Sequence, residues 1–129
     1  MKHSPVSRAA RRALTTLALL GFLPALAFAV PPAKGNAAAG KAIYATKCVS
    51  CHKPDGTGGV ALGANKTPNW TLPAIWADPK RKDRDGYLRS TISDGNIAKG
   101  MVPFVKSGQL KPAEVEHVIA HINTLAKPK

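Results

Sequence analysis

The stretch KCVSCHKPDG, residues 47–56, holds both cysteines of this 129-residue chain, Cys48 and Cys51, and His52 follows directly. Two cysteines three positions apart are compatible with three kinds of site. They can form a redox-active disulfide, bind a zinc ion together with further ligands, or attach a cofactor covalently. Which of the three applies decides what the rest of the chain folds around.

The beginning of the chain has the layout of a secretory signal peptide. Residues 1–12 (MKHSPVSRAARR) are basic, and residues 13–29 (ALTTLALLGFLPALAFA) form an apolar run that ends in a small-residue cleavage pattern. The run is at the short end of the range for a membrane span. The Arg11-Arg12 pair lacks the flanking pattern of a twin-arginine signal.

We therefore expect a signal peptide at residues 1–29 and a single domain at residues 30–129. The expected location is the periplasm, with no stable membrane insertion after cleavage. A retained membrane anchor and a buried core helix are the alternatives for the apolar run.

The charge of this domain favours acidic partners. Without residues 1–29, fifteen basic side chains face seven acidic ones, so the net charge is +8 where the full chain has +12. No stacking motif or recognition helix accompanies this charge, so we expect no binding to nucleic acid. The domain also has only five aromatic residues, and we expect something else to fill part of its core.

Helices are predicted at both ends of the domain and once in between. Asn36 can cap a helix over residues 37–47, and the stretch 85–93 has helical spacing that ends at Gly95. The last helix begins at Pro112 and carries one apolar stripe. No strand pattern appears, and residues 53–83 form a long irregular stretch rich in proline and glycine, which suggests that they wrap something functional. The chain pattern therefore predicts helices and loops and no strand.

Two of the three kinds of site fit this chain poorly. Structural zinc needs four ligands, and the adjacent Cys51 and His52 cannot easily bind one tetrahedral ion. His117 and His121 are four apart on the last helix, but we expect them on a solvated or half-buried face. Catalytic C-x-x-C pairs follow a strand and open a helix, whereas this pair comes at the end of a helix.

The third kind, covalent haem, fits the motif and the export signal together. C-x-x-C-H is the attachment sequence of c-type haem. Cys48 and Cys51 would form the two thioether bonds, and His52 would turn beneath the ring to bind the iron as the proximal ligand. Attachment takes place after export, so a signal peptide is expected with this motif.

A sixth iron ligand is expected from methionine, histidine or lysine, unless the site is open. Met101 is the single methionine of residues 30–129, and it lies in an irregular segment with glycine and proline nearby. It is outside any apolar helical stripe, so we favour it as the distal ligand over His117 and His121.

With these motifs in place, the sequence resembles the class I cytochromes c of the bacterial single-haem type. The stretches AAGKAIYATKCVSCHKPDGTGG, GYLRSTISDGNIAKGMVPF and LKPAEVEHVIAHINTL are similar to the family's first helix and haem site, methionine arm and last helix. The resemblance implies an all-α fold with one haem c, in which loops wrap the haem and the first and last helices cross. Gly40 would permit their close approach, and Tyr44 would pack at the crossing.

The resemblance also implies supporting contacts and shows two departures. The Pro68 carbonyl is the expected acceptor for the Nδ1 proton of His52, and Trp70 or Trp76 could donate to a haem propionate. The family often has Met-Pro, whereas Val102 separates the two residues here. The family also often has an aromatic residue at the position of His121. Histidine at this position is expected to weaken packing at the crossing.

Six-coordinate iron leaves no free site for a substrate, so we expect an electron carrier and not an enzyme. Exposed lysines near the two ligand segments could form a docking ring for redox partners with acidic surfaces; these are Lys47, Lys53, Lys99 and Lys106. One alternative is the cytochrome subunit of a dehydrogenase or oxidase complex. Another is a haem protein with an open iron site, as an enzyme or gas sensor.

Overall fold

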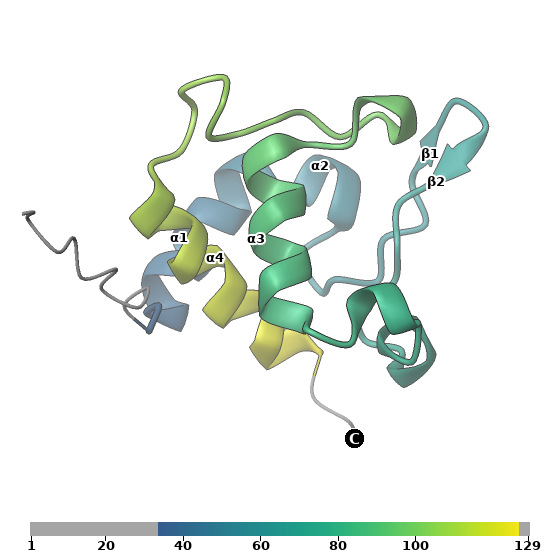
Figure 1. The fold of residues 1–129 in the computed structure, drawn as a ribbon, viewed down its shortest axis with the longest axis horizontal. Coiled ribbons are helices and arrows are strands. Elements are labelled where there is room, and N and C mark those ends of the chain that lie inside the picture. Colours follow the sequence, from purple (N-terminus) through teal and green to yellow (C-terminus); the bar gives the residue numbers. More distant parts are fainter. Residues whose placement is uncertain (1–33, 127–129) are drawn as a thin grey trace, which may run out of the picture.

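The computed structural model describes residues 34–126, so the signal peptide expected at residues 1–29 lies outside the described part of the chain. Within that part the fold is all-α apart from one small hairpin, in agreement with the sequence prediction (Figure 1). The elements, in chain order, are α1 (Ala37–Lys47), α2 (Val49–His52), β1 (Ala61–Leu62), β2 (Asn65–Lys66), η1 (Pro73–Trp76), η2 (Pro79–Arg81), α3 (Arg84–Asp94), η3 (Ile97–Lys99) and α4 (Pro112–Leu125). The helices found between residues 34 and 126 are too short or too polar to cross a membrane.

Capping interactions begin the first and last helices where the sequence predicts them. The Asn36 side chain accepts hydrogen bonds from the backbone N–H groups of Ala38 and Ala39, at 2.9 and 3.0 Å. At α4 the Glu114 carboxylate accepts the backbone N–H of Lys111 at 2.7 Å. Each contact satisfies a backbone donor that the helix itself cannot pair.

Helices α1 and α4 cross closely because glycines of the first segment face the backbone of α4. A Cβ atom at Gly40 would collide with the carbonyl group of His117, and one at Gly35 would collide with that of Glu116. The expected close approach at Gly40 is confirmed. Tyr44, one turn further along α1, is 1% exposed and lies within the core cluster, also as expected.

The apolar stripe of α4 forms one side of the core. Val115, Val118, Ile119 and Ile122 are at most 2% exposed, and Leu125 is half-buried. They pack with residues from α1, α3 and the two long loops: Tyr44, Trp70, Leu88, Ile92, Phe104 and Leu110. The predicted stripe is therefore confirmed, and it ties segments far apart in the sequence into one core.

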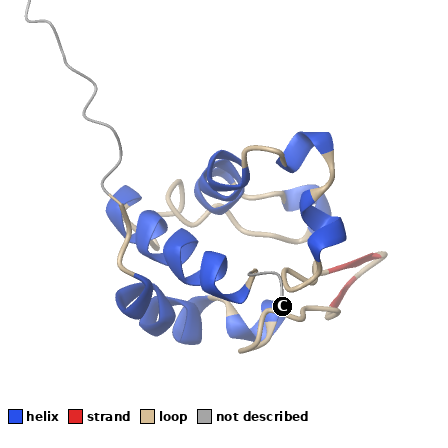
Figure 2. Cartoon of the chain, turned by 90° about the horizontal axis from the view of Figure 1, so that it is seen from below, coloured by secondary structure: helices blue, strands red, loops and turns tan. Residues whose placement is uncertain are grey.

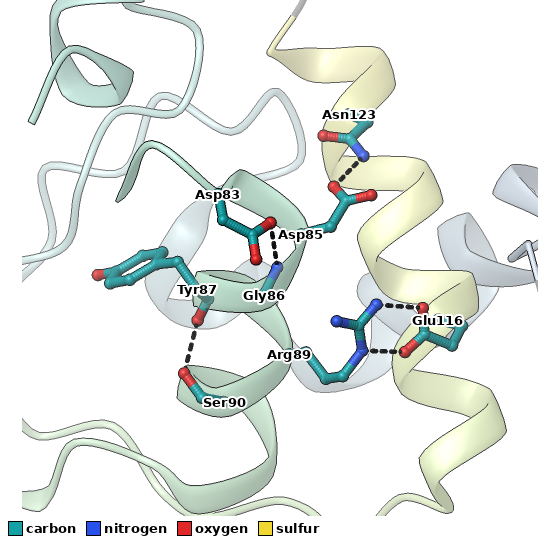
Figure 3. A network of polar contacts seen from close by, with 8 residues as sticks. All are labelled: Asp83, Asp85, Gly86, Tyr87, Arg89, Ser90, Glu116 and Asn123. Carbon is teal, nitrogen blue, oxygen red and sulfur yellow. Dashed lines mark hydrogen bonds and ion pairs between the residues drawn. The ribbon is translucent and has the colours of Figure 1, made fainter. Parts of the chain in front are cut away.

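Polar side-chain contacts join α3 to α4 (Figure 3). The guanidinium of Arg89 forms a two-pronged ion pair with the carboxylate of Glu116, one of its contacts measuring 2.9 Å. One helical turn before Arg89 on α3, the Asp85 carboxylate accepts a hydrogen bond from the Asn123 amide of α4 at 2.8 Å. The two contacts fix α3 alongside α4.

The long segment between α2 and α3 is mainly irregular, as predicted, but it contains a hairpin that the sequence pattern did not reveal. Strands β1 and β2 are antiparallel, with Leu62 opposite Asn65 and a two-residue turn at Gly63-Ala64. Strands of two residues each are too short to produce an alternating pattern. The hairpin lies at the end of the molecule away from the crossing of α1 and α4 (Figure 2).

Candidate haem-binding site

The C-x-x-C-H motif occupies a single helical turn directly after α1. The carbonyl oxygen of Cys48 accepts hydrogen bonds from the backbone N–H groups of Cys51 (3.2 Å) and His52 (2.9 Å). Neither cysteine is in a disulfide bond. All three residues line one cavity of about 430 Å³, a volume in the usual range of cofactor sites.

A smaller hollow adjoins this cavity and extends toward the core. It measures about 80 Å³, and His52, Leu62 and Met101 line both spaces. Leu88 and Ile92 of α3, two members of the core cluster, also face the smaller hollow. The aromatic-poor core thus has open space beside the C-x-x-C-H motif, which is where a covalently attached group would lie.

The imidazole of His52 is buried and neutral. It is 8% exposed, and burial lowers its pKa to about 4. Its ring is stacked on that of Trp70, with centroids 4.2 Å apart and an angle of 17° between the planes. Neutral imidazole is the form that binds metals, so this environment suits an iron ligand.

The expected hydrogen bond from His52 to the Pro68 carbonyl is not formed. The Nδ1 atom of His52 is buried and has no hydrogen-bond partner among the described residues, and the ring stacks on Trp70. A buried polar atom without a partner costs about 1–3 kcal/mol. The protein therefore leaves one ring nitrogen of the buried imidazole without a hydrogen-bond partner.

Met101 reaches the cavity from a different part of the chain. Its backbone forms two hydrogen bonds with Asn96, at 2.8 and 3.0 Å, which close a short loop over η3. The residue before it, Gly100, has a φ of 81° and ends η3 in the left-handed conformation. The fold thus places Met101 and His52 on the same cavity, although 48 residues lie between them in sequence.

The two histidines of α4 lie elsewhere. The Nδ1 atom of His117 accepts the backbone N–H of Asn36 at 3.0 Å, and neither His117 nor His121 lines either hollow. His121 is 7% exposed, with its ring 5.0 Å from that of Tyr44. The expectation of a solvated or half-buried face is therefore wrong for His121, which packs where the family often has an aromatic residue.

The two tryptophans differ in what their N–H groups can do. The indole N–H of Trp76 donates to the carbonyl of Trp70 at 3.0 Å, and the Arg84 guanidinium lies 4.5 Å from the centroid of the Trp76 ring system. Trp76 is thus engaged within the protein. Trp70 lines the smaller hollow, so of the two it is the better candidate to meet a bound group.

The zinc and disulfide alternatives find no support. Between residues 34 and 126, no three or more His, Cys, Asp and Glu side chains are grouped to hold a metal ion. Burial, with a smaller effect of Cys51, raises the pKa of the Cys48 thiol to about 12. Disulfide oxidoreductases need the opposite shift, because the thiolate is the reactive form.

Sequence reasoning missed two residues beside the motif. Thr67 is 7% exposed, and its hydroxyl donates to the Cys51 carbonyl at 2.7 Å. Leu62 of the hairpin lines both hollows. Both lie in an irregular stretch without periodicity, so the sequence carries no signal that could have identified them.

A buried imidazole, two cysteines one helical turn apart and a methionine thus line one cavity, which defines a protein built to bind haem covalently. The model of the family "Cytochrome c" matches residues 37–126, and the chain belongs to this family. It is a c-type cytochrome with a covalently bound haem c, and it takes part in electron transfer.

Two curated relatives are similar to part of the chain. A thiosulfate dehydrogenase of Stutzerimonas stutzeri (strain A1501) is 33% identical over 102 residues, which are 78% of this chain and 31% of that protein. A thiosulfate dehydrogenase of Psychrobacter arcticus (strain DSM 17307 / VKM B-2377 / 273-4) is 30% identical over 89 residues, 69% of this chain and 26% of that protein. The matched region is thus less than a third of either relative. No solved structure matches the chain.

Proposed function

We propose that the protein carries single electrons between redox partners through a haem that His52 and Met101 ligate and that Cys48 and Cys51 hold by thioether bonds. The observation that carries this proposal is that the four side chains line one cavity of about 430 Å³. They come from the turn after α1 and from the loop after α3, two segments that only the folded chain brings together.

The haem supplies a one-electron iron couple, and the protein controls it. Burial keeps the His52 imidazole neutral and free to bind iron. Methionine as the second axial ligand raises the reduction potential, and apolar neighbours such as Leu62 and Phe104 limit water in the cavity. Two strong axial ligands leave no position for a substrate, so the domain would act as a carrier and not as an enzyme.

The proposed partners have acidic docking surfaces. The four lysines of the expected ring, Lys47, Lys53, Lys99 and Lys106, are all exposed. Lys47 lines the larger hollow and Lys99 the smaller, whereas Lys106 lies 3.0 Å from the Asp94 carboxylate. Of these four lysines, Lys47 and Lys99 are therefore the charges that would steer a partner to the haem.

The proposed location is the periplasm, with residues 1–29 removed as a signal peptide and residues 30–129 remaining. Support comes from the basic and apolar layout of the leader and from the attachment of c-type haem after export. The mass of the purified haem protein tests this: we expect residues 30–129 plus one haem. A mass that includes residues 1–29 would contradict the cleavage.

Spectroscopy of Met101→Ala tests the ligand set. We expect this variant to lose the weak red absorption band of the sulfur–iron bond and to have a lower reduction potential. His117→Gln is the matched control, because His117 lies outside both hollows, and it should keep the band. If Met101→Ala keeps an unchanged spectrum, Met101 is not the ligand.

Carbon monoxide separates the carrier from a haem protein with an open iron site. A six-coordinate carrier should bind carbon monoxide only slowly in the reduced state at neutral pH. Rapid binding would contradict the His52/Met101 ligand pair and favour a gas sensor or haem enzyme. The alkaline pyridine spectrum of the same sample tests for covalent haem.

A second candidate function is electron transfer within a thiosulfate-oxidising system. The two relatives named thiosulfate dehydrogenase favour it, and this chain resembles about a third or a quarter of their length. The domain would then accept electrons from a dehydrogenase partner. We expect thiosulfate alone to leave the oxidised protein unreduced. Reduction by thiosulfate without a partner would instead make the domain itself an enzyme.

A further inference from the structure

The hairpin of residues 60–67 is bonded at its base to the haem attachment turn. The Thr67 hydroxyl donates to the carbonyl of Cys51 at 2.7 Å, and the hydroxyl oxygen of Thr67 accepts the backbone N–H of Val60 at 3.0 Å. The backbone N–H of Thr67 donates to the Val60 carbonyl at 2.9 Å. Because Thr67 is 7% exposed, water competes little for these bonds.

The turn end of the hairpin contacts the loop of residues 96–101, here called the methionine loop. A Cβ atom built on Gly100 would lie 3.2 Å from the Cβ of Leu62 and 3.3 Å from its Cδ1, so the leucine side chain packs directly on Gly100. Gly100 immediately precedes Met101. The Asn65 amide adds a hydrogen bond of 3.4 Å to the Ala98 carbonyl.

The methionine loop has little other support on this side. Residues 96–100 are all exposed, and Ile97 of η3 is 70% exposed. The paired backbone bonds between Asn96 and Met101 close the loop but attach it only to itself. A segment with so few buried contacts opens easily, so an added contact at Gly100 has a large share in holding it.

We propose that the 60–67 hairpin is a brace between the two ligand segments, which holds Met101 at the cavity and restricts access of small ligands to the haem iron. The inference rests on the proposed function, in which Met101 is an iron ligand. Thr67 and Leu62 are positioning residues, one fixing the base of the hairpin and the other its contact with Gly100.

The brace lowers the fraction of molecules in which the methionine loop is open. An external ligand such as imidazole can take the methionine position only while the loop is open, so its apparent affinity scales with the open fraction. Removing the Leu62 side chain beyond Cβ takes away the part of the packing on Gly100 that Cγ and Cδ1 provide. Removing the Thr67 hydroxyl frees the base of the hairpin from Cys51. Either change should raise the open fraction and tighten the apparent binding of imidazole.

Imidazole titration of the oxidised haem protein at pH 7 tests the brace, with loss of the weak red band as the signal. We expect Leu62→Ala and Thr67→Val each to bind imidazole about 10-fold more tightly than the unmodified protein. The double variant should bind about as tightly as the stronger single one, because both changes break one brace and their effects should not add.

Matched controls lie in the next loop. Leu72 is 53% exposed and lines neither hollow, so Leu72→Ala removes the same atoms without touching the brace. Thr71→Val removes a hydroxyl that bonds only to Asn69, at 2.7 Å. Both controls should bind imidazole as the unmodified protein does.

Hydrogen exchange provides a second readout that does not depend on imidazole. In Leu62→Ala the backbone N–H groups of Asn96 and Met101 should exchange about 10-fold faster, while those of α4 keep their rates. Leu62→Met, which refills the space, should restore slow exchange. This comparison stays informative if Thr67→Val folds poorly.

The outcomes separate the brace from the ligand assignment. If the unmodified protein lacks the red band, the proposed role of Met101 fails. If it has the band but Leu62→Ala and Thr67→Val bind imidazole like their controls and exchange at unchanged rates, the brace is overturned and the ligand pair stands. If the effects of Leu62→Ala and Thr67→Val on imidazole affinity simply add in the double variant, the two residues do not act through one brace and the proposal is overturned.

Discussion

At the scale of single residues, Lys53 stands out for its backbone. Within residues 34–126 it is the one residue other than glycine with a positive φ, at 59°, and its ψ is 157°. This region is used almost only by glycine, and it costs other residues about 1–3 kcal/mol. The hydroxyl of Tyr44 donates to the Lys53 carbonyl at 2.9 Å and so helps to hold the strained turn directly after His52.

We expect Lys53→Gly to stabilise the haem protein by about 1 kcal/mol, since relief of strain exceeds the extra flexibility that glycine gives the unfolded chain. The midpoint of urea unfolding measures this. Lys99→Gly is the control, because Lys99 is also an exposed lysine but lies in the helical turn η3, where glycine should destabilise. A lower midpoint for Lys53→Gly would contradict the strain.

His121 makes the α1–α4 crossing sensitive to acid. It is 7% exposed, and burial, with a smaller effect of Lys41, lowers the pKa of its imidazole below the ordinary value. The folded state therefore favours neutral His121, and protonation favours unfolding. Its contribution to stability is complete above the unfolded pKa of about 6.5 and is lost as the pH falls through the lower folded pKa.

His121→Phe should remove this dependence. We expect the variant to gain stability relative to the unmodified protein between pH 7.5 and pH 5, because phenylalanine packs on Tyr44 and cannot be protonated. Urea unfolding at the two pH values gives the difference. Asp55, whose pKa is lowered by hydrogen bonds from Thr57, titrates below this range and does not obscure it. Equal pH dependence of both proteins would exclude His121 as the cause.

At the scale of elements, the sequence predicted the helices that carry an apolar periodicity or a capping residue. Asn36, Pro112 and the apolar stripe located α1 and α4, and C-x-x-C-H located the attachment turn. The hairpin and its contacts were not predictable, because the Thr67 bond to Cys51 joins two irregular segments. Likewise, the stacking of His52 on Trp70 depends on a tertiary contact that no local pattern specifies.

The crossing of α1 and α4 depends on Gly40. We expect Gly40→Ala to destabilise the protein by about 1–3 kcal/mol, because the added methyl group collides with the His117 carbonyl and must move a helix. The free energy of unfolding that the collision removes should exceed the roughly 1 kcal/mol that alanine contributes through its higher helix propensity. Urea unfolding measures it, with exposed Ala42→Gly on the same helix as the control for propensity. Stabilisation by Gly40→Ala would contradict the close crossing.

At the scale of the whole molecule, charge and shape act together. Residues 30–129 have a formal net charge of +8, so their field attracts any acidic partner from a distance. That attraction alone does not decide which face docks. Lys99 lines the smaller of the two hollows at His52 and Met101. Lys41 lies on α1 near the crossing and lines neither hollow. The two lysines therefore separate general attraction from local docking.

Charge reversal at these two lysines tests the docking face. Lys99→Glu and Lys41→Glu lower the net charge equally, so general attraction falls by the same amount in both. We expect Lys99→Glu to slow electron transfer with an acidic redox protein about 10-fold at low salt, and Lys41→Glu to slow it much less. The difference should shrink at 1 M salt, where the screening length is about 3 Å. Stopped-flow absorbance of the haem follows the reaction. Equal rates for the two variants would mean that the partner responds only to net charge, and the face around the cavity would then have no special part in docking.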